Sequence, residues 1–185
     1  MGIALADTAA EYGADVTLVL GPAEIAPENS SVRIISVITA ESMASECISR
    51  FPECDIAILS AAVADYTPVS VGKQKLSSDA KEMILKMQKT VDIAATLGGM
   101  KKRSQFLAGF ALETDNEIRN ASAKLKRKKL DIIVLNSLRE QGAGFGYDTN
   151  RITIIDKYNN INKFELKSKT DAARDILDKI VSMIR

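Results

Sequence analysis

Short apolar runs alternate along this chain with segments of helical periodicity, and this alternation restricts the possible folds more than any other feature. The runs have the length of buried strands and are bounded by turn-forming or polar residues. They are Val16–Leu20, Val32–Val37, Asp55–Ser60, Phe106–Ala111 and Ile132–Leu135. Helical spacing covers residues 3–13, 40–50, a stretch from Val91, and 116–130. Strands alternating with helices predict a doubly wound, mostly parallel, Rossmann-like α/β sheet.

The end of the chain departs from this alternation. Residues 151–156 and 159–166 predict a C-terminal β-hairpin, and residues 170–184 predict a closing helix with one apolar face. Earlier in the chain, Met83–Gln88 alternates apolar and polar residues, which is typical of a strand with one exposed face.

Single residues mark the ends of several predicted helices. Thr39 and Thr90 are expected to cap the helices that follow them, because a threonine hydroxyl can accept a hydrogen bond from a free backbone amide. Gly13 is expected to end the first helix, because glycine tolerates the left-handed conformation found after many helices.

Composition fits one globular domain over residues 1–185 and excludes several classes of protein. The net charge is +1, which gives no general attraction to nucleic acid or anionic membranes. No apolar run approaches the roughly 18 residues of a membrane-spanning helix. Cys47 and Cys54 form no CxxC pair and fit a reducing cytoplasm. The chain has no histidine, so its chemistry must use Lys, Asp, Glu, Asn, backbone amides or a bound hard cation.

Small or polar segments come directly after several predicted strands. They are Gly21-Pro22, Ala61–Asp65, Gly109–Glu113 and Asn136. Sheets of this class bind ligands beyond the carboxyl ends of their strands, so these segments predict where a ligand site lies. Small residues such as Ala61 let a ligand approach the backbone. Asp65 can accept hydrogen bonds from a ribose or an amino group or lie near a cation, or it can be an ordinary helix-capping residue.

Cationic side chains and a helix start can hold phosphate groups near that edge. Lys73 and Lys75 lie in a predicted loop, where a lysine suits a polyphosphate but is also common as a solvated residue. Thr90 and Asp92 lie at the start of a predicted helix, whose free amides can bind phosphate oxygens. Both residues are equally ordinary in a helix cap.

Two further features are compatible with a nucleotide. Lys124 and Lys128 lie four residues apart on a predicted helix, so they share one face and either clamp a triphosphate or form a solvated basic face. Phe110 can stack against a base, since every base has a π face, or belong to the core.

Taken together and in order, these segments resemble the phosphopantothenate–cysteine ligase family, also called phosphopantothenoylcysteine synthetase, the ligase domain of the bifunctional coenzyme A biosynthesis flavoprotein. The resemblance spans essentially the whole chain. The segments that carry it are GADVTLVLGP (13–22), AAVADY (61–66), Lys75 ten residues after Asp65, KTVDI (89–93), GFALET (109–114), AKLKRKKLDIIVLN (123–136) and FGYDTN (145–150). No single piece is decisive, but their shared order is hard to obtain by chance.

The resemblance implies a cytoplasmic, homodimeric enzyme that uses CTP, 4′-phosphopantothenate and cysteine, with Mg²⁺ accompanying the triphosphate. The carboxylate of 4′-phosphopantothenate attacks the α-phosphate of CTP, which releases pyrophosphate and gives an acyl-cytidylate. The cysteine amine then attacks the acyl group and releases CMP. Such transfer relies on positioning and charge neutralisation more than on a strong base, which fits a chain without histidine.

The resemblance also assigns a nucleotide-binding role to residues at the predicted strand ends and at the helix start. They are the backbone wall Leu59, Ser60 and Ala61, the acidic contact Asp65, and the helix-start loop Thr90, Val91, Asp92 and Ile93.

The phosphate contacts follow from the same resemblance. Lys75 resembles a catalytic lysine that touches the phosphates, and Lys124 and Lys128 resemble the paired lysines of the nucleotide site. Phe110 resembles an aromatic residue in contact with the nucleotide. Met83–Gln88 resembles a strand of the dimer interface. The resemblance identifies no metal ligand.

Two departures from the family pattern affect the expected activity. Val91 stands where the family usually has proline, which adds a backbone amide and loosens φ. The family also places a strand, a glycine-containing loop and an asparagine that acts on the acyl-cytidylate before the point where this chain begins. Relative to the family the chain is therefore N-terminally truncated, and we expect it to bind CTP weakly without completing the ligation. No FMN is expected on this chain.

Two alternatives stay open. A dinucleotide-dependent, NAD(P)-binding oxidoreductase would have a similar fold. Its glycine fingerprint follows the first strand of such a fold, which would lie before residue 1 of this sequence. An inactive, dimerising nucleotide-binding remnant is the second alternative. Protection by CTP or by NADPH discriminates the first from the ligase, and restoring upstream residues discriminates the second.

Overall fold

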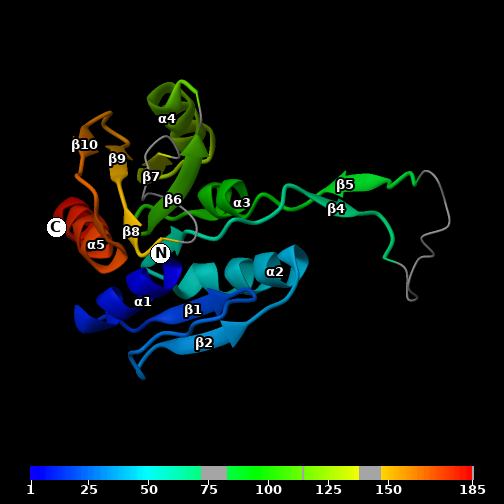
Figure 1. Cartoon of the computed structure of the whole chain (residues 1–185), viewed down its shortest axis with the longest axis horizontal. Coiled ribbons are helices and arrows are strands. Elements are labelled where there is room, and N and C mark those ends of the chain that lie inside the picture. Colours follow the sequence, from blue (N-terminus) through cyan, green and yellow to red (C-terminus); the bar gives the residue numbers. More distant parts are fainter. Residues whose placement is uncertain (72–82, 114, 138–146, 185) are drawn as a thin grey trace.

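The computed structural model describes residues 1–71, 83–113, 115–137 and 147–184, which form an α/β fold around a five-stranded sheet of order β10-β9-β7-β6-β3 (Figure 1). β3 (Ile56–Leu59), β6 (Phe106–Glu113) and β7 (Ile132–Ser137) are parallel. β9 (Ile152–Asp156) pairs antiparallel with β7, and β10 (Ile161–Lys163) pairs antiparallel with β9. The predicted mostly parallel sheet and its C-terminal hairpin are confirmed.

The first two predicted strands belong to a separate sheet. β1 (Thr17–Leu20) pairs in parallel with β2 (Arg33–Ser36), and within the residues described β1 has no other strand partner. Residues 17–19 of β1 and all of β3 line one cavity, so open space rather than a strand ladder lies between the two sheets. The sequence identifies both strands correctly, but it does not reveal that they pair apart from the others.

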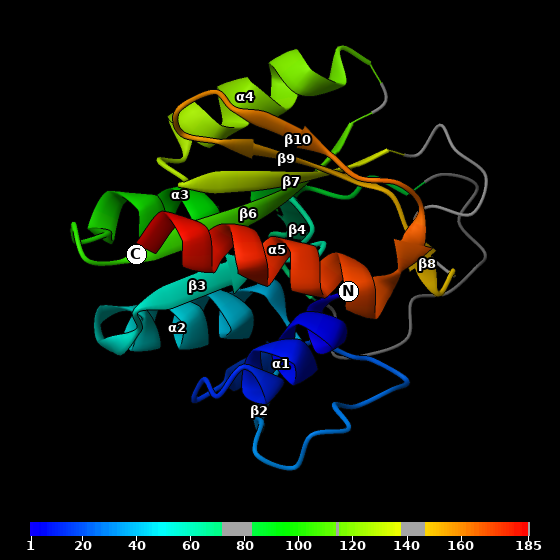
Figure 2. The same ribbon diagram turned by 90° about the vertical axis from the view of Figure 1, so that its left-hand side faces the viewer.

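Helices cover both faces of the five-stranded sheet, as a doubly wound fold requires (Figure 2). α1 (Gly2–Glu11) and α5 (Lys169–Ile184) pack against each other on one face. α3 (Ile93–Met100) and α4 (Glu117–Arg127) lie on the other face, where α2 (Ala40–Arg50) contacts α3. The helix predicted from 170 and the helix predicted over 40–50 are therefore both present.

Alternate residues of the central strands belong to two different hydrophobic cores, one on each face of the sheet. Phe106 and Ala108 of β6 belong to the core under α1 and α5, whereas Leu107 and Ala111 belong to the core under α2, α3 and α4. The same alternation continues in β7 and β9. Because side chains in a strand point to opposite faces in turn, a strand that is apolar at every position must be covered on both sides.

The helix ends follow local chemistry that the sequence shows in part. Thr39 caps α2 as predicted: its hydroxyl accepts a hydrogen bond from the Ser42 amide at 3.0 Å. Gly13 ends α1 as predicted, with φ of 87° and its amide bonded to the Ala10 carbonyl. The helix predicted over 116–130 is shorter, because the chain turns after Arg127 and Lys129 adopts a φ of 52°.

A two-stranded antiparallel ribbon extends away from the body of the molecule (Figure 1). It consists of β4 (Tyr66–Pro68) and β5 (Met87–Lys89). The strand predicted over Met83–Gln88 is therefore shorter and begins later than expected. Alternation of apolar and polar residues predicts an extended segment, but a strand also needs a partner strand. Of the predicted segment, only its last residues, Met87 and Gln88, pair with β4.

The remaining elements are short. A 3₁₀ turn spans Phe51–Glu53, and β8 (Thr149–Asn150) pairs antiparallel with β11 (Lys167–Ser168) directly before α5. No helix in the described ranges is both long and apolar enough to cross a membrane.

The buried carboxylate of Asp131 connects the end of α3, β6 and the turn after β9 at the amino end of β7. It accepts hydrogen bonds from the Lys101 ammonium at 2.6 Å, the Leu107 amide at 2.8 Å and the Lys157 ammonium at 2.9 Å. Burial raises the pKa of Asp131, but these three donors outweigh burial and hold the pKa below the ordinary value of 3.8. The charged form of Asp131 therefore stabilises the fold.

We predict that Asp131→Asn lowers the free energy of unfolding by about 2–4 kcal/mol at pH 7, because it removes the charge that two ammonium groups share. A carboxylate with a lowered pKa stabilises the protein fully above its unfolded pKa, and this contribution is lost as pH falls through the folded pKa. The difference between variant and wild type should therefore shrink below about pH 3.8. Urea unfolding at several pH values measures it, with the exposed Asp55→Asn as control. An equal effect of both substitutions would contradict the prediction.

Candidate functional site

A cavity of about 670 Å³ runs along β3, between α2 and the carboxyl end of the strand, and is lined by most of the residues predicted to bind a nucleotide. It is bordered by the loop after β3, the base of the β4–β5 ribbon, the start of α3 and one face of α4. The predicted residues that line it are Leu59, Ser60, Ala61, Asp65, Thr90, Val91, Asp92, Ile93, Phe110, Lys124 and Lys128. Lys75, the predicted catalytic lysine, lies outside the described residues.

Thr90 fastens the loop after β3 to the loop before α3. Its hydroxyl donates a hydrogen bond to the Ala64 carbonyl at 2.6 Å, and its amide donates to the Asp65 carbonyl at 3.0 Å. The prediction that Thr90 caps a helix is wrong, because its side chain is used across the loops. The two segments that were predicted to form the nucleotide wall are thereby held against each other.

Asp92 is the residue that caps α3. Its side chain accepts a hydrogen bond from the Ala95 amide at 3.1 Å, so the helix begins at Ile93 and not at Val91. Val91 lies in the exposed loop before the cap, where neither a valine nor a proline would interrupt the helix. The helix start still borders the cavity, two residues later than predicted.

Lys128 and Asp92 form an ion pair on the cavity wall, with the ammonium nitrogen 3.0 Å from Oδ1. Burial raises the pKa of Asp92, but hydrogen bonds from the Ala95 amide and the Lys128 ammonium outweigh it, and the pKa lies below its ordinary value of 3.8. Asp92 is therefore ionised at neutral pH.

Lys124 forms the second ion pair of the site, with Oε1 of Glu113 at 2.5 Å. Glu113 is the last residue of β6, so its side chain reaches α4 from the carboxyl edge of the sheet. Lys124 and Lys128 lie on the same face of the helix, while Ala121 and Leu125 of α4 are buried in the core. The predicted pair of lysines thus faces one cavity.

The carbonyl of Lys128 is held by an unusually close contact with α3. A Cβ atom added to Gly98 would lie 1.9 Å from this carbonyl oxygen, so the two helices approach closely only because residue 98 is glycine. The end of α4 is fixed on the other side by the Leu130 amide, which donates to the Leu125 carbonyl at 3.0 Å. The left-handed Lys129 between them completes a Schellman turn.

Three residues that shape the site are not among those predicted from the sequence. Glu113 ends the predicted segment Gly109–Glu113, in which the sequence pointed to Phe110 alone. Arg127 lines the cavity beside Lys128 and belongs to the same basic run. Gly98 carried the clearest signal, because a glycine inside a helix lowers helix propensity and so needs a packing reason.

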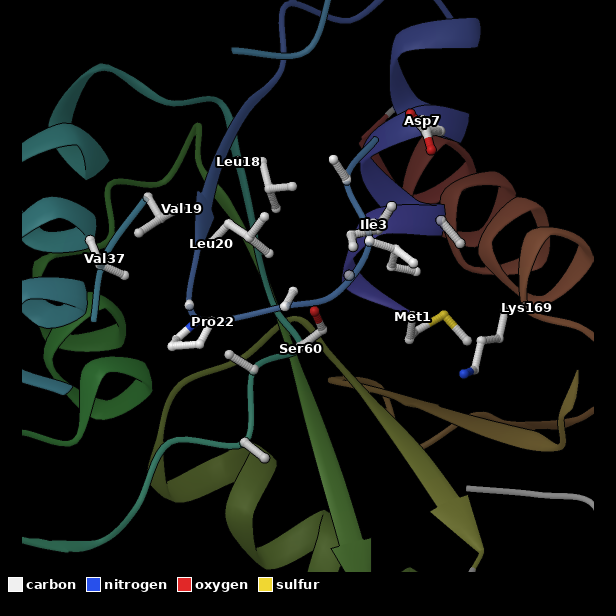
Figure 3. A pocket seen from close by; sticks show the side chains of 18 of the residues that line it. Met1, Ile3, Asp7, Leu18, Val19, Leu20, Pro22, Val37, Ser60 and Lys169 are labelled. Atoms are coloured by element: carbon white, nitrogen blue, oxygen red, sulfur yellow. The ribbon is translucent and has the colours of Figure 1, made fainter. Parts of the chain in front are cut away.

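A larger cavity of about 1380 Å³ adjoins the first (Figure 3). Leu18 and Leu20 of β1 line it opposite Ile3 of α1, and Ser60 lies between them in the view. Lys169, at the start of α5, lines it near Met1. Both cavities are lined by residues 60, 61, 63 and 64, so the loop after β3 borders the two spaces at once.

Neither cavity contains a protein-built metal site in the part of the chain that is described. No group of three or more cysteine, aspartate or glutamate side chains there could hold a metal ion. Cys47 and Cys54 are free thiols, and burial raises the pKa of each.

Comparison with known proteins gives one consistent family match. Residues 1–184 match the family model described as DNA/pantothenate metabolism flavoprotein C-terminal domain. The coenzyme A biosynthesis bifunctional protein CoaBC of Bacillus subtilis (strain 168) is 39% identical over 183 residues, which are 99% of this chain and 45% of that protein. The crystal structure of the C-terminal domain of a CoaBC protein superposes with a TM-score of 0.81 at 37% identity, covering 98% of this chain and 82% of that chain.

A further relative carries a different name. A cysteine/cysteine sulfinic acid decarboxylase from an unknown prokaryotic organism is 58% identical over 184 residues, which are 100% of this chain and 51% of that protein. The chain thus spans about half the length of the curated relatives it matches.

We predict that Gly98→Ala lowers the free energy of unfolding by about 1–3 kcal/mol, because α3 must withdraw from the backbone of Lys128. The matched control is Gly99→Ala in the same helix, where an added Cβ meets nothing within 4 Å. The control should stabilise the protein by roughly 0.5–1 kcal/mol, because alanine has the higher helix propensity. Urea unfolding of both variants tests the pair, and effects of the same sign would contradict the proposed contact.

Proposed function

This chain belongs to the family of the DNA/pantothenate metabolism flavoprotein C-terminal domain, and from that membership we propose that it is a CTP-dependent phosphopantothenate–cysteine ligase domain of coenzyme A biosynthesis. In the proposed reaction the carboxylate of 4′-phosphopantothenate attacks the α-phosphorus of CTP. The bond between the α-phosphorus and the bridging oxygen breaks, pyrophosphate leaves and an acyl-cytidylate remains. The cysteine amine then attacks the acyl carbon, loses a proton and displaces CMP.

The observation that carries this proposal is the convergence of Lys124, Lys128 and the start of α3 on one cavity beside Asp65. A triphosphate needs positive charge and amide donors around its oxygens, and the two lysines and the amides at a helix start supply both. Charge neutralisation and alignment are the main requirements of nucleotidyl transfer. A site without histidine can therefore perform it.

The adjoining larger cavity supports a location for the second substrate. We assign the nucleotide to the cavity at α3 and α4, and 4′-phosphopantothenate to the cavity between α1, β1 and α5. Because the loop of residues 60–64 borders both, the carboxylate of one substrate can meet the α-phosphate of the other along this loop. Small residues such as Ala61 leave the backbone open to both ligands.

Magnesium belongs to the proposal as the partner of the triphosphate, and it would neutralise charge on the leaving pyrophosphate. Mg²⁺ is commonly held by one or two carboxylates together with substrate phosphates. Asp65 lines the nucleotide cavity and is the residue that we propose for such a contact. A cytoplasmic setting is also part of the proposal and is supported by the free thiols of Cys47 and Cys54.

A second candidate follows from the relative of 58% identity, whose name denotes a cysteine or cysteine sulfinic acid decarboxylase. This chain would then be one part of a protein that acts on cysteine without a nucleotide. Decarboxylation needs no triphosphate site, so the paired lysines favour the ligase. The NAD(P)-dependent oxidoreductase considered from the fold gains no support from the family match.

We predict that CTP raises the melting temperature of the chain and that NADPH does not. Replacing Lys124 or Lys128 by alanine should weaken CTP binding at least tenfold, about 1.4 kcal/mol, because each lysine supplies a charge-assisted contact. Isothermal titration measures the dissociation constants, with Lys163→Ala on β10, outside both cavities, as control. Protection by NADPH alone, or unchanged CTP affinity in both lysine variants, would contradict the nucleotide assignment.

We also propose that the β4–β5 ribbon mediates a homodimer. Large apolar side chains are exposed along it, and Ile84, next to β5, is 95% exposed. A contiguous exposed apolar patch is typical of an interaction surface. Tyr66, Met83, Leu85 and Met87 are also exposed, in or directly before the strands of the ribbon.

Accordingly, Ile84→Asp combined with Met87→Asp should convert a dimer to a monomer without unfolding it, because a charge in the interface would lose its solvation. Light scattering after size-exclusion chromatography gives the mass. Leu166→Asp places the same charge on an exposed leucine outside the ribbon and should leave the dimer intact. A monomeric wild type, or a dimer that resists both ribbon substitutions, would contradict the proposed interface.

A further inference from the structure

The two lysines that face the cavity are each paired with a carboxylate that comes from another element. Asp92, from the start of α3, holds Lys128 at 3.0 Å, and Glu113, from the end of β6, holds Lys124 at 2.5 Å. Two positive charges are thus matched by two negative ones. The site carries compensating charges where a triphosphate would place its anionic oxygens.

Both carboxylates are held in place by the fold, although the side chain of Asp92 is 48% exposed. Asp92 is fixed because the same oxygen that contacts Lys128 also accepts the Ala95 amide as the cap of α3. Glu113 is fixed because its side chain is only 13% exposed and belongs to the last residue of a central strand. The lysines lie on long flexible stems, so the ammonium groups can change partner while the carboxylates stay in place.

The two carboxylates come from different elements, but each has the same two effects on its lysine. Each carboxylate orients an ammonium group toward the space between β6, α3 and α4, which reduces the conformational entropy that the lysine would lose on binding. Each also competes with any incoming anion for the charge of the same ammonium group. Orientation favours binding, whereas competition opposes it.

We propose that Asp92 and Glu113 are positioning residues whose carboxylates act as built-in competitors of the nucleotide phosphates, so that a triphosphate binds by displacing them from Lys128 and Lys124. This proposal rests on the assignment of the cavity to a nucleotide. Exchange of a carboxylate for a phosphate leaves each lysine paired in both states. When pyrophosphate and CMP form, the carboxylates recapture the lysines and promote release of both products.

The two positions allow substitutions that remove charge and keep shape. Asn is as good a helix cap as Asp, so Asp92→Asn retains the start of α3. Glu113→Gln is likewise isosteric. Structural damage at either position would weaken binding, whereas loss of competition strengthens it, so the two effects have opposite signs.

The experiment titrates CTP and, separately, inorganic tripolyphosphate into wild type, Asp92→Asn, Glu113→Gln and the double variant, each with and without Mg²⁺. We expect three- to tenfold tighter binding of both anions by each single variant and a larger gain in the double variant. Glu165→Gln, an exposed carboxylate that pairs with Arg151 outside both cavities, should bind as wild type does.

The outcomes separate this inference from the function on which it rests. Unchanged or weaker binding in the neutralised variants overturns the competition, and weakening that occurs only with Mg²⁺ overturns it in favour of metal ligation. Tighter tripolyphosphate binding without CTP binding in any variant supports the exchange at the lysines but refutes the nucleotide assignment. Tighter binding of both anions supports both.

Discussion

The parallel pairing of β6 with β3 on one side and β7 on the other is the constraint on which the rest of this molecule depends. β6 is apolar at consecutive positions, so the sheet is buried on both faces and needs helices on both. The same pairing brings the carboxyl ends of β3 and β6 to one edge. Near that edge, Ala61 and Asp65 line one cavity with Asp92 at the start of α3, and Glu113 pairs with Lys124 of α4. Phe110 also lines this cavity, but it packs against the core on the opposite face, under α1 and α5.

The geometry of the site also depends on how closely α3 approaches the end of α4. Gly98 lets α3 lie against the Lys128 carbonyl, and Asp92, at the other end of the same short helix, contacts the Lys128 ammonium. One helix thus fixes both the backbone and the side chain of a single lysine. Preorganisation of this kind lowers the conformational entropy that the lysine loses when an anion binds.

Separate sheets and adjoining cavities give the molecule room for two ligands. The strand ends of the five-stranded sheet and the basic helix α4 border the smaller cavity. The larger cavity is enclosed by β1, α1 and the start of α5. The proposed two-step ligation would need a nucleotide and an acyl substrate side by side. The loop after β3, which Thr90 holds by two hydrogen bonds, borders both spaces, as do Leu18 and Val19 of β1.

The sequence by itself determined the order of strands and helices, the cap at Thr39, the stop at Gly13 and the terminal hairpin, because local patterns encode burial and helix ends. The family resemblance added a part of the residues that line the smaller cavity. Tertiary structure alone decided that Thr90 bridges two loops, that Asp92 caps α3, that β1 and β2 pair apart from the main sheet, and that Glu113 and Gly98 position the lysines. Apart from the Asp92 cap, whose partner Ala95 is three residues away, each of these depends on a partner distant in the chain. Periodicity and composition report which face of an element is buried, but not which atom lies opposite.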